Sequence, residues 1–139
     1  GVDGLILPDL PEYEFEKMYA EIIFKYKLNF IFLITPETSV ERIKKLDQLS
    51  SGFLYAVSSS STTGSQIDAN QVDAYLKRLQ SYNLINPVLV GFGIKDQESF
   101  LRACQYTNGA IIGSAYIRAL SKGGDIQEIT KDFLSAITA

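Results

Sequence analysis

The sequence predicts an α/β fold built on a parallel sheet, and three observations support this. Apolar runs typical of strands alternate with amphipathic patterns typical of helices, and the alternation occurs five times along the 139 residues. The runs are continuously apolar, as expected for parallel strands that are covered on both faces. Each strand–helix unit spans about 25 to 30 residues, which fits a βα repeat. Because no linker or low-complexity tract separates the units, residues 1–139 are interpreted as one domain.

The first two units each place a short apolar run before a helix pattern. Residues 5–7 form the first predicted strand, which a Pro-Asp-Leu-Pro segment ends. The helix that follows is predicted from apolar side chains spaced three and four apart: Phe15, Met18, Tyr19, Ile22, Ile23 and Tyr26. Residues 30–34 form the second strand, and residues 38–41 are a predicted capping box. The next helix has an apolar stripe of Val40, Ile43, Leu46 and Leu49.

The last three units follow the same plan. Residues 53–57, 88–94 and 110–112 are the predicted strands. A loop of small hydroxyl residues follows the first of these, and Asp68 is expected to cap the helix after it. The apolar positions of the helices in this half are Val72, Tyr75, Leu76, Leu79 and Tyr82, then Phe100, Leu101 and Cys104, and finally Ile126, Ile129, Phe133, Leu134 and Ile137. A short helix over residues 115–120 precedes the closing one.

Five parallel strands fit two architectures. An open sheet of the flavodoxin type has five strands, whereas an eight-stranded barrel needs roughly 250 residues. A complete five-stranded sheet would leave two long, apolar edges unprotected, which favours part of a barrel. The strands that begin at Leu5 and Ala110 are then expected to lack a partner. We expect the 139-residue chain by itself to dimerise, to associate with a complementary half, or to aggregate.

Composition excludes several classes of function. The formal net charge is −3 and the basic residues are scattered, so nothing indicates nucleic-acid binding. No apolar run approaches the roughly 18 residues of a membrane span, and the chain does not open with a basic and then apolar leader. The single cysteine, Cys104, excludes an internal disulfide and suits a reducing compartment such as the cytoplasm. Its place beside Phe100 and Leu101 predicts a buried structural thiol.

The absence of histidine narrows the possible chemistry. It excludes histidine metal sites, Ser-His triads and histidine bases, so acid–base steps would fall to carboxylates, Tyr or Lys. Asp9 is the one carboxylate at the end of a predicted strand on the presumed site side. From the residues alone it is the candidate acid–base group.

Two strands that end in glycine predict an anion site. The runs 88–94 and 109–115 both end this way, and the second leads into a helix. Glycine leaves backbone N–H groups unshielded, and a helix start adds unpaired donors and a favourable dipole. Because parallel strands end at the same edge of a sheet, Gly93, Gly113 and Ser114 predict a cradle for phosphate. No Lys or Arg lies within these motifs, so the cradle is predicted to need no basic side chain.

Several motifs in order resemble the tryptophan synthase alpha subunit family, from its fourth strand to its C-terminus. They are the Asp-x-Pro loop within residues 1–11, residues 32–36 with 41–43, residues 53–58 with Thr63-Gly64, the Gly-Phe-Gly-Ile of residues 91–94, and residues 109–115. The resemblance implies an α/β fold, a (β/α)8 TIM barrel, of which this chain is the C-terminal five βα units. It implies a lyase of tryptophan biosynthesis that cleaves indole-3-glycerol phosphate to indole and glyceraldehyde 3-phosphate. It also implies no metal or organic cofactor, and a cytoplasmic alpha2beta2 complex with a beta subunit.

The resemblance also assigns roles to particular residues. Gly64, Gly93, Gly113 and Ser114 match its phosphate-binding positions, and Thr63 matches a threonine of its mobile loop that contacts the catalytic aspartate. Tyr55 and Phe92 match side chains that contact the indole ring. Asp9 becomes a supporting residue that lines the substrate site near the partner surface. Ser61 stands where the family commonly has glycine, which bears on loop closure.

The family's acid–base pair is a glutamate on strand two and an aspartate in the loop after it, and both would precede residue 1. No catalytic residue is therefore expected here, and the isolated chain is expected to be inactive. Two alternatives stay open: another phosphate-binding barrel enzyme, such as an isomerase or a thiamin-phosphate-type synthase, and a non-catalytic half-barrel that binds phosphate or a protein partner.

Overall fold

The computed structural model describes residues 1–58 and 69–138. Its strands are β1 (Gly4–Ile6), β2 (Asn29–Ile31), β3 (Leu33–Ile34), β4 (Leu54–Ala56), β5 (Val88–Val90) and β6 (Gly109–Ala110). Its helices are α1 (Glu12–Glu14), the π-helical turn η1 (Phe15–Tyr19), α2 (Ala20–Lys25), α3 (Val40–Leu49), α4 (Ala69–Gln80), α5 (Gln97–Cys104), α6 (Ser114–Leu120) and α7 (Ile126–Thr138). Within these ranges no helix has the length and hydropathy of a membrane span. The predicted features at Ser61, Thr63, Gly64 and Asp68 lie outside the described residues.

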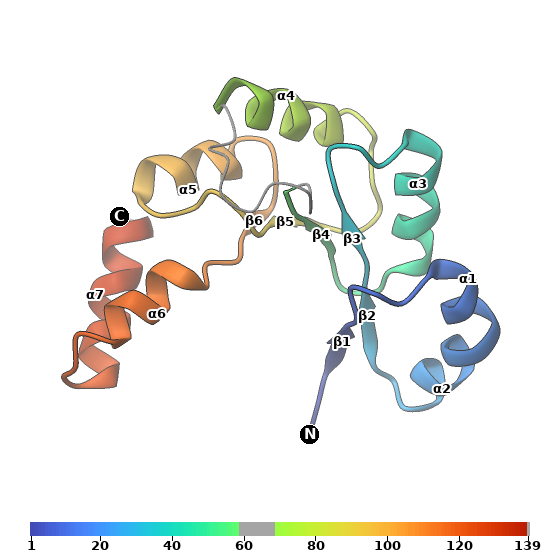
Figure 1. Ribbon diagram of the computed structural model, residues 1–139, viewed down its shortest axis with the longest axis horizontal. Helices are drawn as coiled ribbons and strands as arrows, with labels where there is room; N and C mark the ends of the chain where they lie inside the picture. Colours follow the sequence, from blue (N-terminus) through green and yellow to red (C-terminus); the bar gives the residue numbers. More distant parts are fainter. Residues whose placement is uncertain (59–68, 139) are drawn as a thin grey trace.

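Every strand pair in the described residues is parallel, which confirms the predicted α/β class. β1 pairs with β2, and a second sheet has the order β3-β4-β5-β6. Figure 1 shows the strands along the inside of an arc, with α1 to α5 outside it. Consecutive strands within each sheet are therefore neighbours, and the helices from α1 to α5 connect successive parallel strands over the outer face. The carboxyl ends of β4, β5 and β6 consequently lie at one edge of the sheet.

The predicted strand over residues 30–34 is divided at Phe32. Its first half, β2, pairs with β1, and its second half, β3, pairs with β4. Phe32 donates its N–H to Ser50 Oγ at 3.1 Å, while its carbonyl accepts from Tyr55 N at 3.0 Å. The Ser50 side chain thus replaces one inter-strand hydrogen bond at the point where the strand stops pairing with β1 and begins to pair with β4. The backbone N–H and C=O of Phe32 therefore both remain hydrogen-bonded.

The core lies between the strands and the outer helices. Phe15, Phe30 and Phe32 form a ring cluster with centroid distances of 4.4, 5.1 and 4.8 Å. The cluster fastens the first helical segment to the strand that joins the two sheets. The largest fully buried side chains are Phe30, Ile34, Ile43, Leu54, Leu76, Leu79 and Val90. All seven are positions that the sequence predicts in strands or in helix stripes.

The predicted stripe of the first helix is only partly buried. Phe15 and Ile23 are in the core, but Met18, Ile22 and Tyr26 are 61%, 53% and 65% exposed. The reason is the π-helical turn η1, which holds more residues per turn than an α-helix. Residues spaced three and four apart therefore do not stay on one face of the helix across the whole segment. The prediction of a single regular amphipathic helix is wrong.

The capping box predicted at residues 38–41 is also wrong. The N-cap of α3 is Ser39, whose hydroxyl accepts from Arg42 N at 3.3 Å. Thr38 Oγ1 instead accepts from Thr35 N at 2.9 Å, within the turn that precedes the helix. Because the helix begins one residue later than predicted, Arg42 rather than Glu41 is its third residue and lacks the acceptor that a capping box requires.

Cys104 is half-buried, which corrects the expectation of a buried thiol. It ends α5, and Leu101 on the same helix is 53% exposed. Partial burial still raises the pKa of the Cys104 thiol, because the thiolate would be poorly solvated there. The residue therefore favours its neutral form, as a packing thiol would.

A carboxylate fastens α3 to the segment between α4 and β5. Asp47 is 4% exposed, and its two oxygens accept from Ile85 N at 2.7 Å and from Asn86 N at 2.9 Å. Asn86 Nδ2 donates both to Asp47 Oδ1 at 3.0 Å and to the Asp47 carbonyl at 2.6 Å. This cluster joins two outer units just before the chain enters β5.

Candidate functional site

A pocket lies at the carboxyl ends of β4, β5 and β6, where the sequence predicts the phosphate cradle. Its volume is about 490 Å³. Five of the residues predicted as site residues line it together: Tyr55, Phe92, Gly93, Gly113 and Ser114. The other lining residues are Gly91, Ile94, Lys95, Ile111 and Ile112. Segments more than fifty positions apart in the sequence therefore meet at one site, because the strands that carry them are adjacent and parallel.

The two cradle glycines open onto free space. A Cβ atom built on either Gly93 or Gly113 would meet no heavy atom within 4 Å. Gly93 has a φ of +71°, in the left-handed region that favours glycine, so a side chain would be strained there. Gly113 is the N-cap of α6, and Ser114 is its first residue. Within the described residues no side chain caps this helix start, so the backbone N–H groups of its first turn have no side-chain acceptor.

Tyr55 and Gly91 both line the pocket and lie against each other. Tyr55 is in the middle of β4, and Gly91 follows β5 and donates its N–H to Ala56 O at 2.9 Å. The Tyr55 ring lies so close to the Gly91 backbone that a Cβ atom at Gly91 would coincide with it. Gly91 was not predicted as a site residue. Gly91 directly follows Val90, which pairs with Ala56 beside Tyr55. A glycine next to a strand position that carries an aromatic ring is the signal that could have identified it.

Gly91→Ala is expected to displace the Tyr55 ring and to lower the free energy of unfolding by about 1 to 3 kcal/mol. Chemical denaturation of the variant measures this cost. The control is to introduce Gly91→Ala into the Tyr55→Ala variant. There the ring is absent, so the added methyl group should lower the free energy of unfolding much less. An equal cost in both backgrounds would mean that the ring does not explain the glycine.

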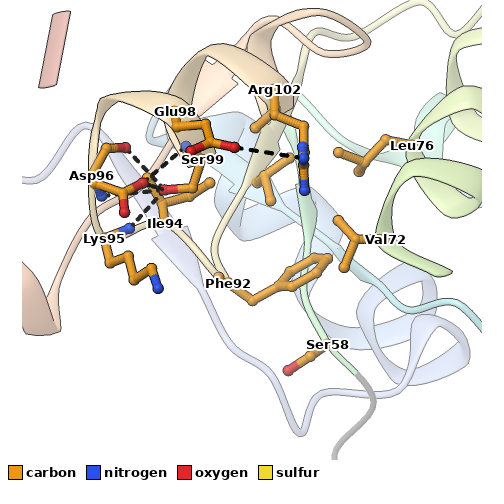
Figure 2. A pocket seen from close by; sticks show the side chains of 13 residues that line it. Ser58, Val72, Leu76, Phe92, Ile94, Lys95, Asp96, Glu98, Ser99 and Arg102 are labelled. Atoms are coloured by element: carbon orange, nitrogen blue, oxygen red, sulfur yellow. Dashed lines mark hydrogen bonds and ion pairs between the residues drawn. The ribbon is translucent and has the colours of Figure 1, made fainter. Parts of the chain in front are cut away.

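Phe92 forms a wall between this pocket and a second one. Its ring stacks on Tyr75 of α4 with centroids 6.4 Å apart and an interplanar angle of 27°. Burial raises the pKa of the Tyr75 hydroxyl, so that residue stays neutral. The second pocket, of about 540 Å³, lies between α4 and α5, and Figure 2 shows Phe92 facing Val72 across it. Its far side carries Arg102, which pairs with Glu98 at 3.8 Å and with Asp73 at 3.9 Å.

The remaining predicted residues are placed elsewhere or not described. Asp9 is exposed on the turn after β1 and is not among the lining residues of either pocket. Thr63 and Gly64 lie outside the described residues. Sequence reasoning missed Lys95, which directly follows the Gly-Phe-Gly-Ile motif and lines both pockets. Among the described residues that line the cradle pocket, it is the one charged side chain.

The family model and the similar proteins all identify the same family. The family model described as "Tryptophan synthase alpha chain" matches residues 1–137. The tryptophan synthase alpha chain of Flavobacterium johnsoniae is 51% identical over 131 residues, which are 92% of this chain and 52% of that protein. The one from Bacteroides thetaiotaomicron is 46% identical over 126 residues, 90% of this chain and 49% of that protein. The chain thus spans about half the length of the curated relatives it matches.

Solved structures agree with the sequence relatives. The tryptophan synthase A-subunit of Pyrococcus furiosus superposes with a TM-score of 0.76 and 30% identity, covering 99% of this chain and 54% of that one. Tryptophan synthase from M. tuberculosis, in its aminoacrylate-bound form, gives 0.69 and 29%, covering 88% and 44%. The likeness confirms the predicted TIM-barrel architecture over the open flavodoxin-like sheet. The order of the parallel strands, the pocket at their carboxyl ends and both comparisons lead to one conclusion: the chain belongs to the tryptophan synthase alpha chain family.

Proposed function

We propose that this chain supplies the phosphate- and indole-binding part of a lyase that cleaves indole-3-glycerol phosphate to indole and glyceraldehyde 3-phosphate in tryptophan biosynthesis. The observation that carries the proposal is the pocket at the ends of β4, β5 and β6. There glycine backbone, a helix start and a serine hydroxyl lie beside two aromatic rings. A substrate with a phosphate at one end and an aromatic ring system at the other needs such a combination of donors and apolar surface.

The phosphate is assigned to Gly93, Gly113 and Ser114. Their backbone N–H groups can approach an anion closely, and the dipole of α6 favours negative charge at Ser114. The indole ring is assigned to the side of the pocket lined by Tyr55 and Phe92. In the same proposal Gly64 contributes a further phosphate contact, Thr63 takes part in loop closure, and Asp9 supports the substrate near the partner surface.

Proton transfer is not assigned to this pocket. The reaction is a retro-aldol cleavage, which needs an acid to protonate the indole ring and a base to take a proton from a glycerol hydroxyl. Among the described lining residues there is no carboxylate. We therefore propose a binding role for these residues, with no metal or organic cofactor. We also propose a cytoplasmic complex with the tryptophan synthase beta subunit, to which indole would pass.

The phosphate assignment is tested by titration with glycerol 3-phosphate. Ser114→Ala removes one hydroxyl donor and is expected to weaken binding by about 1 to 3 kcal/mol, or roughly 5- to 150-fold. The matched control is Ser121→Ala at the other end of α6, where the hydroxyl donates to Arg118 O at 2.9 Å away from the pocket. Calorimetry should show unchanged affinity for the control. Equal affinities for both variants would remove Ser114 from the site.

The lyase assignment is tested separately, by indole release from indole-3-glycerol phosphate by the protein that carries this chain. Release that depends on the cradle residues supports the proposal. Phosphate binding with no indole release would favour the alternative of a binding module without catalysis.

A further inference from the structure

The charge at the rim of the cradle pocket differs from what the sequence predicts. The pocket's lining consists of apolar side chains, glycines, Tyr55, Ser114 and one ionised side chain, Lys95. Lys95 is exposed, two residues after Gly93 and just before α5 begins. Backbone amide donors together with a cation at the rim are groups that attract an anionic ligand.

Within the described residues the ammonium group of Lys95 forms no ion pair with the acidic residues next to it, although its charge adds to the hydrogen bonds from Ser99 in lowering the pKa of the Asp96 carboxyl. The carboxylate of Asp96 is the cap of α5, where it accepts from Ser99 N at 3.0 Å and from Ser99 Oγ at 2.6 Å. Glu98 pairs with Arg102. Figure 2 shows the Lys95 side chain extended away from that pair, and Lys95 has no ion pair within the described parts of the chain. Its charge is therefore available to a ligand.

The backbone of Lys95 is fixed by the same cap. Lys95 N donates to Ser99 Oγ at 3.1 Å, and Asp96 N donates to it at 3.2 Å. Asp96 and Ser99 complete a reciprocal capping box. The start of the Lys95 side chain is thus held beside the cradle, and only its four-carbon stem is free to move. An ammonium on such a tether can reach an anion at the rim without ordering any backbone.

We propose that Lys95 is a further binding residue for the substrate phosphate, attracting the dianion to the pocket and neutralising part of its charge once it is bound. This inference rests on the proposed phosphate role of the cradle and adds a charged contact to it. The amide donors of Gly93, Gly113 and Ser114 fix the position of the phosphate. Lys95 supplies the long-range attraction that uncharged donors lack.

The test is calorimetric titration with glycerol 3-phosphate at two ionic strengths, about 0.01 M and about 0.15 M. Lys95→Met is expected to raise Kd about 3- to 15-fold at low salt, because it removes one exposed cation near a dianion. At the higher salt concentration the increase in Kd should be less than half as large, because ions screen the attraction. Lys95→Arg keeps the charge and should keep most of the affinity. The control is Lys44→Met, which removes the same charge from the exposed face of α3.

The outcomes separate this inference from the proposed function. If the unmodified protein binds glycerol 3-phosphate and Lys95→Met binds equally well at low salt, the role of Lys95 is disproved while the cradle stands. An equal loss in Lys44→Met would show a general charge effect and would also overturn it, as would a loss that salt does not change. If the unmodified protein does not bind glycerol 3-phosphate at all, the cradle itself is wrong, and Lys95 with it.

Discussion

Gly113→Asp is expected to eliminate phosphate binding and to leave the fold unchanged. The new carboxylate would stand at the N-cap of α6, where the phosphate is assigned. Two like charges about 4 Å apart repel by at least roughly 2 kcal/mol for a dianion even in water, and by more in a partly enclosed site. Titration with glycerol 3-phosphate should therefore show affinity reduced at least about 30-fold.

The geometry of Gly113 makes this substitution informative. Its φ of −97° is accessible to any residue, and no atom lies within 4 Å of an added Cβ. The dipole of α6 also favours a negative charge at its start, so the free energy of unfolding should change little. Gly113→Ala is the matched control, because it adds the Cβ without the charge and should weaken binding far less. Undiminished binding by Gly113→Asp would show that phosphate does not bind at the start of α6.

Asp47→Ala is expected to lower the free energy of unfolding by about 3 kcal/mol. The carboxylate is buried and accepts from the backbone N–H groups of Ile85 and Asn86 and from Asn86 Nδ2. Removing it leaves these donors without their acceptor in a partly buried place, and a donor that is left unsatisfied costs more than the hydrogen bond contributes. Urea denaturation measures the change.

A double-mutant cycle with Asn86→Ala separates the Asp47 contacts. Because the two side chains bond to each other and to one loop, the double variant should be more stable than the sum of the single effects implies. Lys44→Ala on the exposed side of the same helix should cost well under 1 kcal/mol. Strictly additive effects, or a loss for Asp47→Ala no larger than for Lys44→Ala, would contradict the structural role of the cluster.

The sequence by itself determined the order of the elements and the edge of the sheet at which the pocket lies. Continuous apolar runs placed β1 and β4 within a residue or two and gave the first residue of β5, whose end was predicted four residues too late, and regular stripes placed α3 and the closing helix α7. These signals are local, because strands and helices impose their own periods on buried side chains. The glycine motifs around Gly93 and Gly113 indicated the edge of the sheet where the loops converge, because the carboxyl ends of parallel strands all lie at the same edge.

Only the tertiary structure decided where the local patterns break and which side chains meet. The division of a strand at Phe32 depends on the hydrogen bond that Phe32 N donates to Ser50 Oγ, and the exposure of Met18 depends on a π-helical turn. Asp9 lies on the turn after β1 and is not among the residues that line the pocket, whereas Lys95, just outside the Gly-Phe-Gly-Ile motif, does line it. Periodicity fixes how each segment buries itself, but contacts between segments depend on the register and curvature of the sheet, which no local pattern encodes.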